Sequence, residues 1–366
     1  MKKRISKYGL AVCSAVLAGA LFAPAAYAQD EVVWFGCAGE NALDTMSAAV
    51  LDKDIGFAEK GLRETTANRT VGGKVDTVVV VSADGWWDAL SSEGLAGIDG
   101  APVLVTDSRT LSSQTKHVIE TLGAKRAVVV GGPESVSDSV VSDLEALLGS
   151  RPERVAGADA QATSRAVYHA RDTWAKTAFV ATSSTFQDAL SVAPYAYAKG
   201  CPVILAGSDG LLSAESLEIL ANGGFDEVVI AGGPLSVPDS ELDRIKSALG
   251  ASCTVSRLFG DDAVATCAAV IDWGAGRGYT FKGGAVADAR GWYDALVGAA
   301  CSGRHGMALA LVDGPASKSL DAMVRAQRTT DGDETYSGFV FGGYDSVSKE
   351  TCDHLPLTIP TVVLPD

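Results

Sequence analysis

The sequence predicts an α/β protein made of three tandem units, each built on its own parallel sheet. An Asp-Ala-Leu triplet recurs three times, and in each copy a glycine follows the aspartate by twelve residues: Asp88 and Gly100, Asp188 and Gly200, Asp294 and Gly306. Short strands rich in valine and isoleucine alternate with helical segments, which is typical of βαβ units. These strands are almost continuously apolar, which indicates parallel sheets covered on both faces.

The N-terminal segment has the pattern of a secretory signal peptide, which we expect to span residues 1–28. Four cations precede an apolar run over about residues 10–25, and a small-x-small site ends at Ala28. A transmembrane anchor is the alternative, but the run is too short and contains Pro24. No later stretch approaches the ~20 apolar residues that a membrane span requires. We therefore expect an exported protein that has no membrane span.

Charge and cysteine content narrow the class of protein further. The chain has 30 Lys+Arg and 45 Asp+Glu, a formal net charge of −15. Nucleic-acid binding requires a basic surface, and none is visible, so we expect no nucleic acid as a partner. The six cysteines after residue 28 form no CxxC pair, so we expect no metal site. Either one or two disulfides or scattered buried thiols fit these cysteines.

The repeat predicts domain boundaries near residues 151 and 251, which gives units 29–150, 151–250 and 251–366. Each unit is expected to open with a short strand, reading VVWFGCAG, ERVAGAD or VSRLFGDD. A glycine near the end of this segment is followed six residues later by a threonine: Gly39 and Thr45, Gly157 and Thr163, Gly260 and Thr266. An alanine-rich helix with a clear apolar face follows. Next comes an apolar strand, in residues 77–81, 178–181 and 285–287.

The second half of each unit also repeats. The Asp-Ala-Leu helix leads to a strand reading PVLV, PVIL or ALAL, then to an amphipathic helix and a strand that ends in Gly-Gly. A last helix closes the unit, and Ser137, Ser236 and Ser348 are expected to cap its first turn. About four strands per unit follow from this series. Unit 1 also carries a polar insertion at about 51–74, which is expected to form a surface excursion.

Two repeated loops are candidate binding sites, because parallel sheets place their ligand loops at the carboxyl ends of the strands. The loop before each Asp-Ala-Leu is rich in aromatic and hydroxyl groups. Its aspartate either caps the helix or, with the aromatic rings, forms a sugar-binding lip. The Gly-Gly turns either hold an anion through backbone N–H groups or serve as tight turns. The binding candidates of this loop are Trp87, Asp88, Asp188, Tyr293 and Asp294.

The combination of Gly-x5-Thr, Asp-Ala-Leu-Ser, Gly-x-Pro-Val and Val-Val-Ile-x-Gly-Gly resembles the cell wall binding repeat 2 family of Gram-positive bacteria. The resemblance implies three Rossmann-like or Toprim-like units in a pseudo-threefold arrangement. It also implies non-covalent attachment to an anionic secondary wall polymer, through a motif that maps onto two strands: Pro102, Val103, Leu104 and Val105, and Pro202, Val203, Ile204 and Leu205. Unit 3 departs from this motif, because Ala308 replaces the proline.

Catalysis finds little support in the sequence. The four histidines occupy unrelated places in the repeats, and no nucleophile elbow, HExxH or P-loop motif occurs. We therefore expect no enzyme and no cofactor, but a cell-wall protein with several weak sites for an anionic polymer or polysaccharide. Other surface proteins are a second class of partner. The alternative function is that of a secreted α/β hydrolase or solute-binding protein built on the repeat scaffold.

Overall fold

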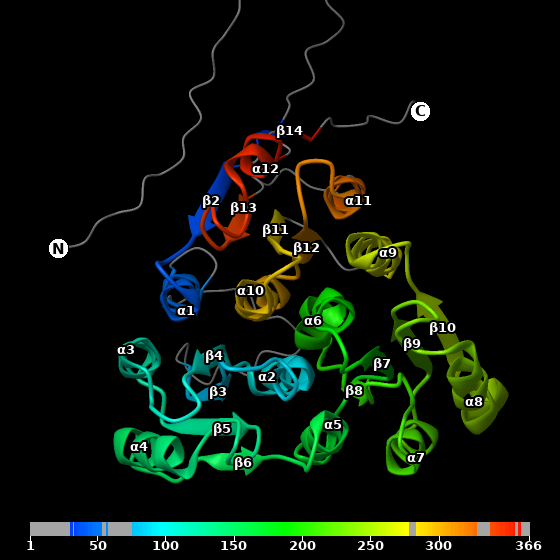
Figure 1. The fold of residues 1–366 in the computed structure, drawn as a ribbon, viewed down its shortest axis with the longest axis horizontal. Coiled ribbons are helices and arrows are strands. Elements are labelled where there is room, and N and C mark those ends of the chain that lie inside the picture. Colours follow the sequence, from blue (N-terminus) through cyan, green and yellow to red (C-terminus); the bar gives the residue numbers. More distant parts are fainter. Residues whose placement is uncertain are drawn as a thin grey trace, which may run out of the picture.

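The computed structural model describes residues 30–31, 33–52, 56–57, 75–277, 283–327, 337–355 and 358–359. Three four-stranded parallel sheets are arranged around a common centre (Figure 1), which confirms the predicted α/β class and its three pseudo-threefold units. A short antiparallel pair, β1 (Asp30–Glu31) with β14 (Thr358–Ile359), joins the two ends of the described chain. The predicted signal peptide lies outside the described residues.

The three sheets share one strand order. Sheet 1 is β4 (Val103–Thr106), β3 (Thr77–Ser82), β5 (Arg126–Val130) and β6 (Glu153–Val155). Sheet 2 is β8 (Val203–Ala206), β7 (Thr177–Thr182), β9 (Glu227–Ala231) and β10 (Thr254–Leu258). Sheet 3 is β12 (Ala308–Val312), β11 (Gly283–Asp288), β13 (Ser337–Phe341) and β2 (Val33–Cys37).

The fourth strand of each sheet differs from the expectation that every unit uses its own opening strand. The opening strand of unit 2, β6, completes sheet 1, and that of unit 3, β10, completes sheet 2. The opening strand of unit 1, β2, pairs with β13 and completes sheet 3. An apolar strand pattern does not name its partner, so the sequence could not assign these strands. The boundaries near 151 and 251 stay a prediction, and each of the three sheets combines strands from two of the predicted units.

Helices follow the strands in the predicted series. The central helices are α2 (Ser92–Asp99), which follows a 3-10 turn at Ala89–Ser91, α6 (Gln187–Lys199) and α10 (Trp292–Arg304). Those between neighbouring sheets are α1 (Ala42–Val50), α5 (Ala160–His169) and α9 (Ala263–Ala275). The outer helices are α3 (Ser113–Leu122), α4 (Asp138–Leu148), α7 (Ala214–Asn222), α8 (Asp239–Leu249), α11 (Lys318–Gln327) and α12 (Lys349–Asp353), and a 3-10 turn at Gly250–Ser252 follows α8. No helix of the described chain is long and apolar enough to cross a membrane.

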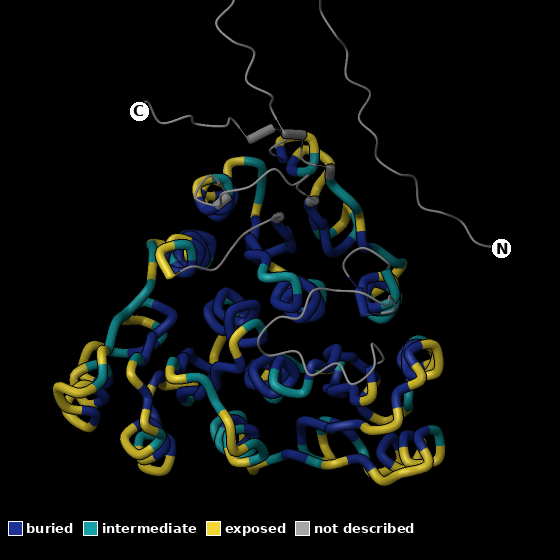
Figure 2. Tube along the Cα trace, turned by 180° about the vertical axis from the view of Figure 1, so that it is seen from behind, coloured by how far each residue is buried: buried dark blue, intermediate teal, exposed yellow. Residues whose placement is uncertain are grey.

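The core lies where α2, α6 and α10 meet (Figure 2). These helices approach closely because small residues face the contacts: a Cβ on Gly97 would lie 1.9 Å from the carbonyl oxygen of Tyr197. Two charged groups are buried among them. Glu93 on α2 is 0% exposed, and neither of its carboxyl oxygens has a hydrogen-bond partner among the described residues. The guanidinium of Arg304 lies 4.4 Å from the centre of the Phe57 ring.

Three smaller expectations are settled by the structure. Ser137 and Ser348 cap α4 and α12 as predicted, but Ser236 does not cap α8, because Pro238 occupies the N-cap position. The predicted insertion at 51–74 is only partly described, and its Phe57 is buried rather than on a surface excursion. Of the two alternatives for the cysteines, disulfides or thiols, the structure shows thiols. None of these six described residues is in a disulfide: Cys37, Cys201, Cys253, Cys267, Cys301 and Cys352.

Candidate functional site

A serine–aspartate hydrogen bond joins two loops in every unit. The serine hydroxyl of each Gly-Gly turn donates to the aspartate of the same unit's Asp-Ala-Leu triplet. The distances are 2.5 Å for Ser135 to Asp88, 2.8 Å for Ser236 to Asp188 and 3.0 Å for Ser346 to Asp294. The expected helix-capping role of the aspartate is therefore wrong. The carboxylate instead ties the start of the central helix to the Gly-Gly turn that follows β5, β9 or β13.

The same carboxylate explains the first glycine of each turn. Gly131, Gly232 and Gly342 have φ angles of 126°, 115° and 104°, a region that favours glycine. A Cβ on these residues would lie 2.9, 2.4 and 2.4 Å from the aspartate oxygen of the same unit. Any larger residue would therefore push the carboxylate away from the serine. The Gly-Gly turn is a tight turn built around a carboxylate that is buried in unit 2 and partly buried in units 1 and 3.

Burial affects the acidity of these carboxyl groups. Desolvation raises the pKa of Asp188, and the hydrogen bond from Ser236 opposes this rise. Desolvation likewise raises the pKa of Asp294, against the hydrogen bond from Ser346. Both carboxylates hold the loops in place through their serine partners.

An arginine on the edge strand fixes the same turn in units 1 and 2, whereas in unit 3 Arg290, from the loop before α10, donates to the carbonyl of Ser346 at 3.1 Å. Arg154 on β6 donates through Nη1 to the carbonyls of Gly131 and Val136, both at 2.8 Å. Arg257 on β10 donates to Gly232 at 3.2 Å and to Val237 at 2.7 Å. In sheet 3 the residue at this register position is Gly36, which pairs with Val340 as Arg257 pairs with Ile230.

The Gly-x5-Thr motif marks the start of each junction between neighbouring units. The threonine hydroxyl accepts the backbone N–H of the glycine, at 3.0 Å for Gly157 to Thr163 and 3.1 Å for Gly260 to Thr266. Gly39 and Thr45 make the same bond at 3.2 Å. This bond folds the chain from a strand of one sheet into a helix that packs on the next sheet. The segment therefore forms one wall of each junction.

A cleft lies between units 1 and 2, at the carboxyl ends of the strands of sheets 1 and 2, and we name it the first junction cleft. Its volume is about 870 Å³. Unit 1 contributes the loop before α2 and the Gly-Gly turn, while unit 2 contributes the loops that follow β6, β7 and β8. The lining residues are Trp87, Asp88, Gly132–Ser135, Gly157–Gln161, Ser183, Ser184 and Gly207–Asp209.

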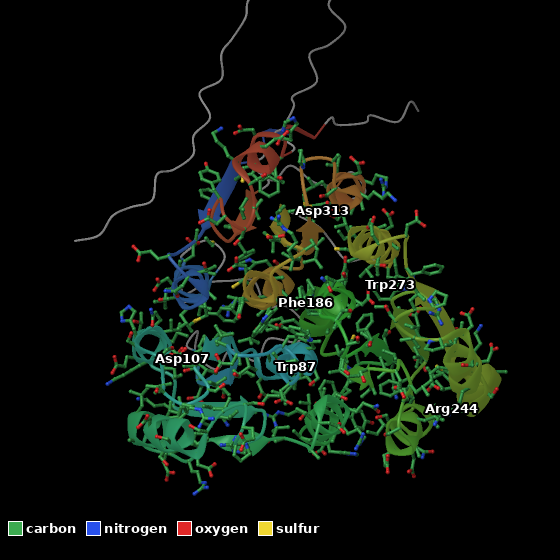
Figure 3. All side chains as sticks on the ribbon, viewed as in Figure 1. Trp87, Asp107, Phe186, Arg244, Trp273 and Asp313 are labelled. Atoms are coloured by element: carbon green, nitrogen blue, oxygen red, sulfur yellow. The ribbon has the colours of Figure 1, made fainter. Side chains whose placement is uncertain are left out.

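The chemistry of this cleft suits a polyhydroxylated ligand. Carboxylates and serine hydroxyls line it, and none of the lining residues is a lysine or arginine. Trp87 is 50% exposed and lies against Trp86, with ring centres 4.8 Å apart. Trp86 is in turn 5.3 Å from Phe186 of unit 2, and Figure 3 shows Trp87 and Phe186 beside the central helices. Trp87 therefore packs on Trp86, which makes the aromatic contact between the two units.

The predicted site residues divide into three groups. Trp87 and Asp88 lie in the first junction cleft. Asp188, Asp294 and Tyr293 occupy the corresponding loops of units 2 and 3, where Tyr293 is half-buried against Trp292 at 4.1 Å. The remaining residues are buried in or next to β4 and β8 and do not reach the surface: Pro102, Val103, Leu104, Val105, Pro202, Val203, Ile204 and Leu205.

The predicted binding residues in and next to β4 and β8 do not line the first junction cleft. The loop after β8, Gly207–Asp209, forms part of the cleft wall, so the packing of β8 sets its position. Sequence reasoning missed Ser183, Ser184 and Asp209, although each follows a predicted strand end. Asp159 was also missed as a lining residue, and its carboxylate caps α5. No three His, Cys, Asp or Glu side chains in the described ranges are grouped suitably for a metal ion.

Comparisons with known proteins agree with this architecture. Two curated relatives come from Bacillus subtilis (strain 168). The protein named Amidase enhancer is 28% identical over 306 residues, which is 83% of this chain and 40% of the relative. The N-acetylmuramoyl-L-alanine amidase LytC is 29% identical over 171 residues, which is 47% of this chain and 34% of the relative. The chain thus spans less than half the length of these relatives.

Two solved structures share the fold. Cwp8 from Clostridium difficile has a TM-score of 0.72 at 23% identity, covering 89% of this chain and 51% of that protein. Cwp6 from the same organism has a TM-score of 0.70 at 17% identity, covering 91% of this chain and 49% of that protein.

The repeats themselves match a family described as Cell wall binding domain 2 (CWB2), in residues 37–141, 154–241 and 257–352. The three matches correspond to the three predicted units and together cover most of the chain. They confirm the predicted wall-binding function and the location at the cell wall. The chain belongs to the cell wall binding domain 2 family.

Proposed function

We propose that the chain attaches non-covalently to the wall by binding the sugar rings of an anionic wall polymer in the first junction cleft. The half-exposed Trp87 is the observation that carries this proposal. An apolar ring face on the floor of a polar cleft fits a pyranose, which has an apolar face and a rim of hydroxyl groups. The carboxylates and hydroxyls around Trp87 are suited to hydrogen bonds with that rim.

The charge of the cleft restricts how an anionic polymer would lie in it. Asp88, Glu134, Asp159 and Asp209 are among the lining residues, and no cation opposes them. Negative groups of the polymer would therefore point to solvent, and the neutral sugar rings would enter the cleft. Binding of this kind should not weaken as salt rises, because it gains nothing from opposite charges.

We also propose that the matched region is a binding module and not an enzyme. In the first junction cleft, Asp88 and Ser135 bond to each other to hold the turn, and no histidine lines the cleft to activate the serine. The alternative of a secreted hydrolase predicts release of wall fragments. Incubating the protein with purified walls and measuring new reducing ends and free amines tests this, and any release above that of a heat-inactivated sample would favour the hydrolase.

Co-sedimentation with purified walls tests the site. We expect the wild-type chain to sediment with intact walls and to remain in solution once the anionic polymer has been stripped. Trp87→Ala should weaken binding roughly tenfold, because it removes the ring face. Leu235→Ala is the matched control, since Leu235 is also exposed but lies outside this cleft.

The outcomes separate the parts of the proposal. Equal binding by Trp87→Ala and Leu235→Ala would remove the first junction cleft from the binding site. Unchanged binding to stripped walls would exclude the anionic polymer as the ligand. A steep loss of binding between low and high salt would show that charge attraction, and not recognition of neutral rings, drives attachment.

A further inference from the structure

The exposed apolar side chains of the described residues are not scattered. The large ones are Trp87, Leu211, Leu235, Phe259 and Tyr344. Each lies on a loop that follows the carboxyl end of a strand, after β3, β8, β9, β10 and β13. Single exposed apolar residues are ordinary on a protein surface, but their confinement to the loops that form the junctions is not expected by chance.

Phe259 lies at the second junction, between units 2 and 3. It follows Leu258, whose carbonyl accepts the N–H of Gly232, just as Val155 accepts that of Gly131 at the first junction. The next residue, Gly260, therefore corresponds to Gly157, which lines the first junction cleft. A Cβ built on Gly233 would lie 3.3 Å from the Phe259 ring, so this ring lies beside the Gly-Gly turn.

Tyr344 lies at the third junction, between units 3 and 1. It directly follows Gly342 and Gly343, so it corresponds to Pro133, another lining residue of the first junction cleft. Tyr344 is 45% exposed, close to the 50% of both Trp87 and Phe259. Each junction therefore presents one half-exposed aromatic ring.

The three rings come from three different positions of the repeat. At the position of Trp87, unit 2 has Gln187, whose side chain donates to the carbonyl of Ala289 at 3.1 Å. At the position of Phe259 the other units have Ala38 and Ala156, and at that of Tyr344 they have Pro133 and Pro234. Two junctions thus lack a ring at the Phe259 position and two at the Tyr344 position, whereas at the Trp87 position unit 3 has Tyr293 and only unit 2 lacks a ring. No junction lacks a ring altogether.

Polar groups accompany the ring at each junction. At the second junction Asp262 caps α9 as Asp159 caps α5, and Ser236 occupies the place of Ser135. At the third junction Asn41 caps α1, and Ser346 takes the corresponding place. Each junction therefore combines one aromatic ring with a serine hydroxyl and a carboxylate or amide side chain. The serine and the capping residue stand at the same repeat position in every unit, whereas the ring does not.

We infer that all three junctions are sugar subsites, with Trp87, Phe259 and Tyr344 as their stacking platforms, so that one polymer chain is held at three places. This inference rests on the proposed function. It assigns unit 3 a binding role even though Ala308 replaces the proline of its strand motif. Three weak sites on one repeating ligand raise the overall affinity through effective concentration, without any new contact.

The test uses the full chain and intact walls, with Trp87→Ala, Phe259→Ala and Tyr344→Ala made singly and together. Each single variant should lose roughly three- to tenfold in affinity, and the triple variant should lose the product of these factors. Leu235→Ala is the matched control, because this residue lies at the second junction and is fully exposed but carries no ring. Thermal unfolding should be unchanged in all of them, since the rings are on the surface.

The result separates this inference from the function on which it rests. If Trp87→Ala alone loses affinity while Phe259→Ala and Tyr344→Ala bind like the wild type, the first cleft is a single site and the inference is wrong. If none of the three variants loses affinity, the proposed saccharide site falls as well. A loss in Leu235→Ala equal to that in Phe259→Ala would show that apolar area, and not ring stacking, determines binding at the second junction.

Discussion

Gly36→Arg should stabilise the protein, because it supplies the arginine that sheet 3 lacks. In the other two sheets this arginine donates to two carbonyls of the Gly-Gly turn, at 2.8 and 2.8 Å for Arg154 and 3.2 and 2.7 Å for Arg257. The matching acceptors in unit 3 are the carbonyls of Gly342 and Val347. A Cβ added at Gly36 would meet nothing within 4 Å, so the side chain has room to leave the strand.

The size of the gain follows from opposing contributions. Two hydrogen bonds from a charged donor contribute about 1.5–3 kcal/mol each, and replacing glycine within a strand adds roughly 0.5–1 kcal/mol. Fixing the long side chain costs up to about 2 kcal/mol, and desolvation, which lowers the pKa of Arg257, costs more. Arg154 and Arg257 also form ion pairs with Asp138 and Asp239, whereas unit 3 has Lys349 at that position, so the new arginine would lack this partner. We therefore expect a net gain of about 1–2 kcal/mol.

Urea unfolding and thermal unfolding measure this gain directly. A gain of 1 kcal/mol should raise Tm by about 2 °C in a chain of this size. Gly36→Ala is the matched control, because it removes the flexibility of glycine without adding a donor. A Gly36→Arg variant no more stable than Gly36→Ala would refute the argument that the arginine position of sheet 3 is vacant and able to accept one.

Two further predictions concern buried acidic groups. Burial raises the pKa of Glu93, so the folded protein holds the proton of this carboxyl group more tightly than the unfolded chain does. The free energy of unfolding of the wild type should therefore fall as pH rises above about 4.3. Glu93→Gln should remove that fall, which urea titrations from pH 4 to 8 would measure. Ser236→Ala should cost about 1–3 kcal/mol, because it leaves the buried Asp188 carboxylate without its donor, whereas Ser240→Ala on the exposed face of α8 should cost little in the same unfolding assay.

The repeated strands were predictable because their signal is local. The strand expected at 77–81 is found at Thr77–Ser82, and the one expected at 178–181 at Thr177–Thr182. Runs of valine mark a buried strand whatever its partner is. The pairing of the opening strands was not predictable, because β6, β10 and β2 have the same apolar pattern and differ only in which sheet they join.

The candidate site was predictable only where position and chemistry recur together. Trp87 and Asp88 follow a recurring triplet, and both lie in the first junction cleft. Phe259 and Tyr344 escaped notice because each occurs at one repeat position in one unit only. A search for recurrence discards such residues, although packing brings them to equivalent places. The role of Asp188 was misassigned for a related reason: its partner, Ser236, is 48 residues away in sequence.

Each sheet takes its edge strand from another unit: sheet 1 from unit 2, sheet 2 from unit 3, and sheet 3 from unit 1. The three units are therefore linked in a ring through their sheets. Because β2 of unit 1 completes a sheet whose other three strands belong to unit 3, sheet 3 cannot be completed until both parts of the chain are present. A fragment cut at the repeat boundaries would leave one sheet without its edge strand and expose an unpaired ladder. A circular permutant that links Asp30 to Ile359, which the pairing of β1 with β14 brings side by side, and opens between β6 and α5 should retain every sheet.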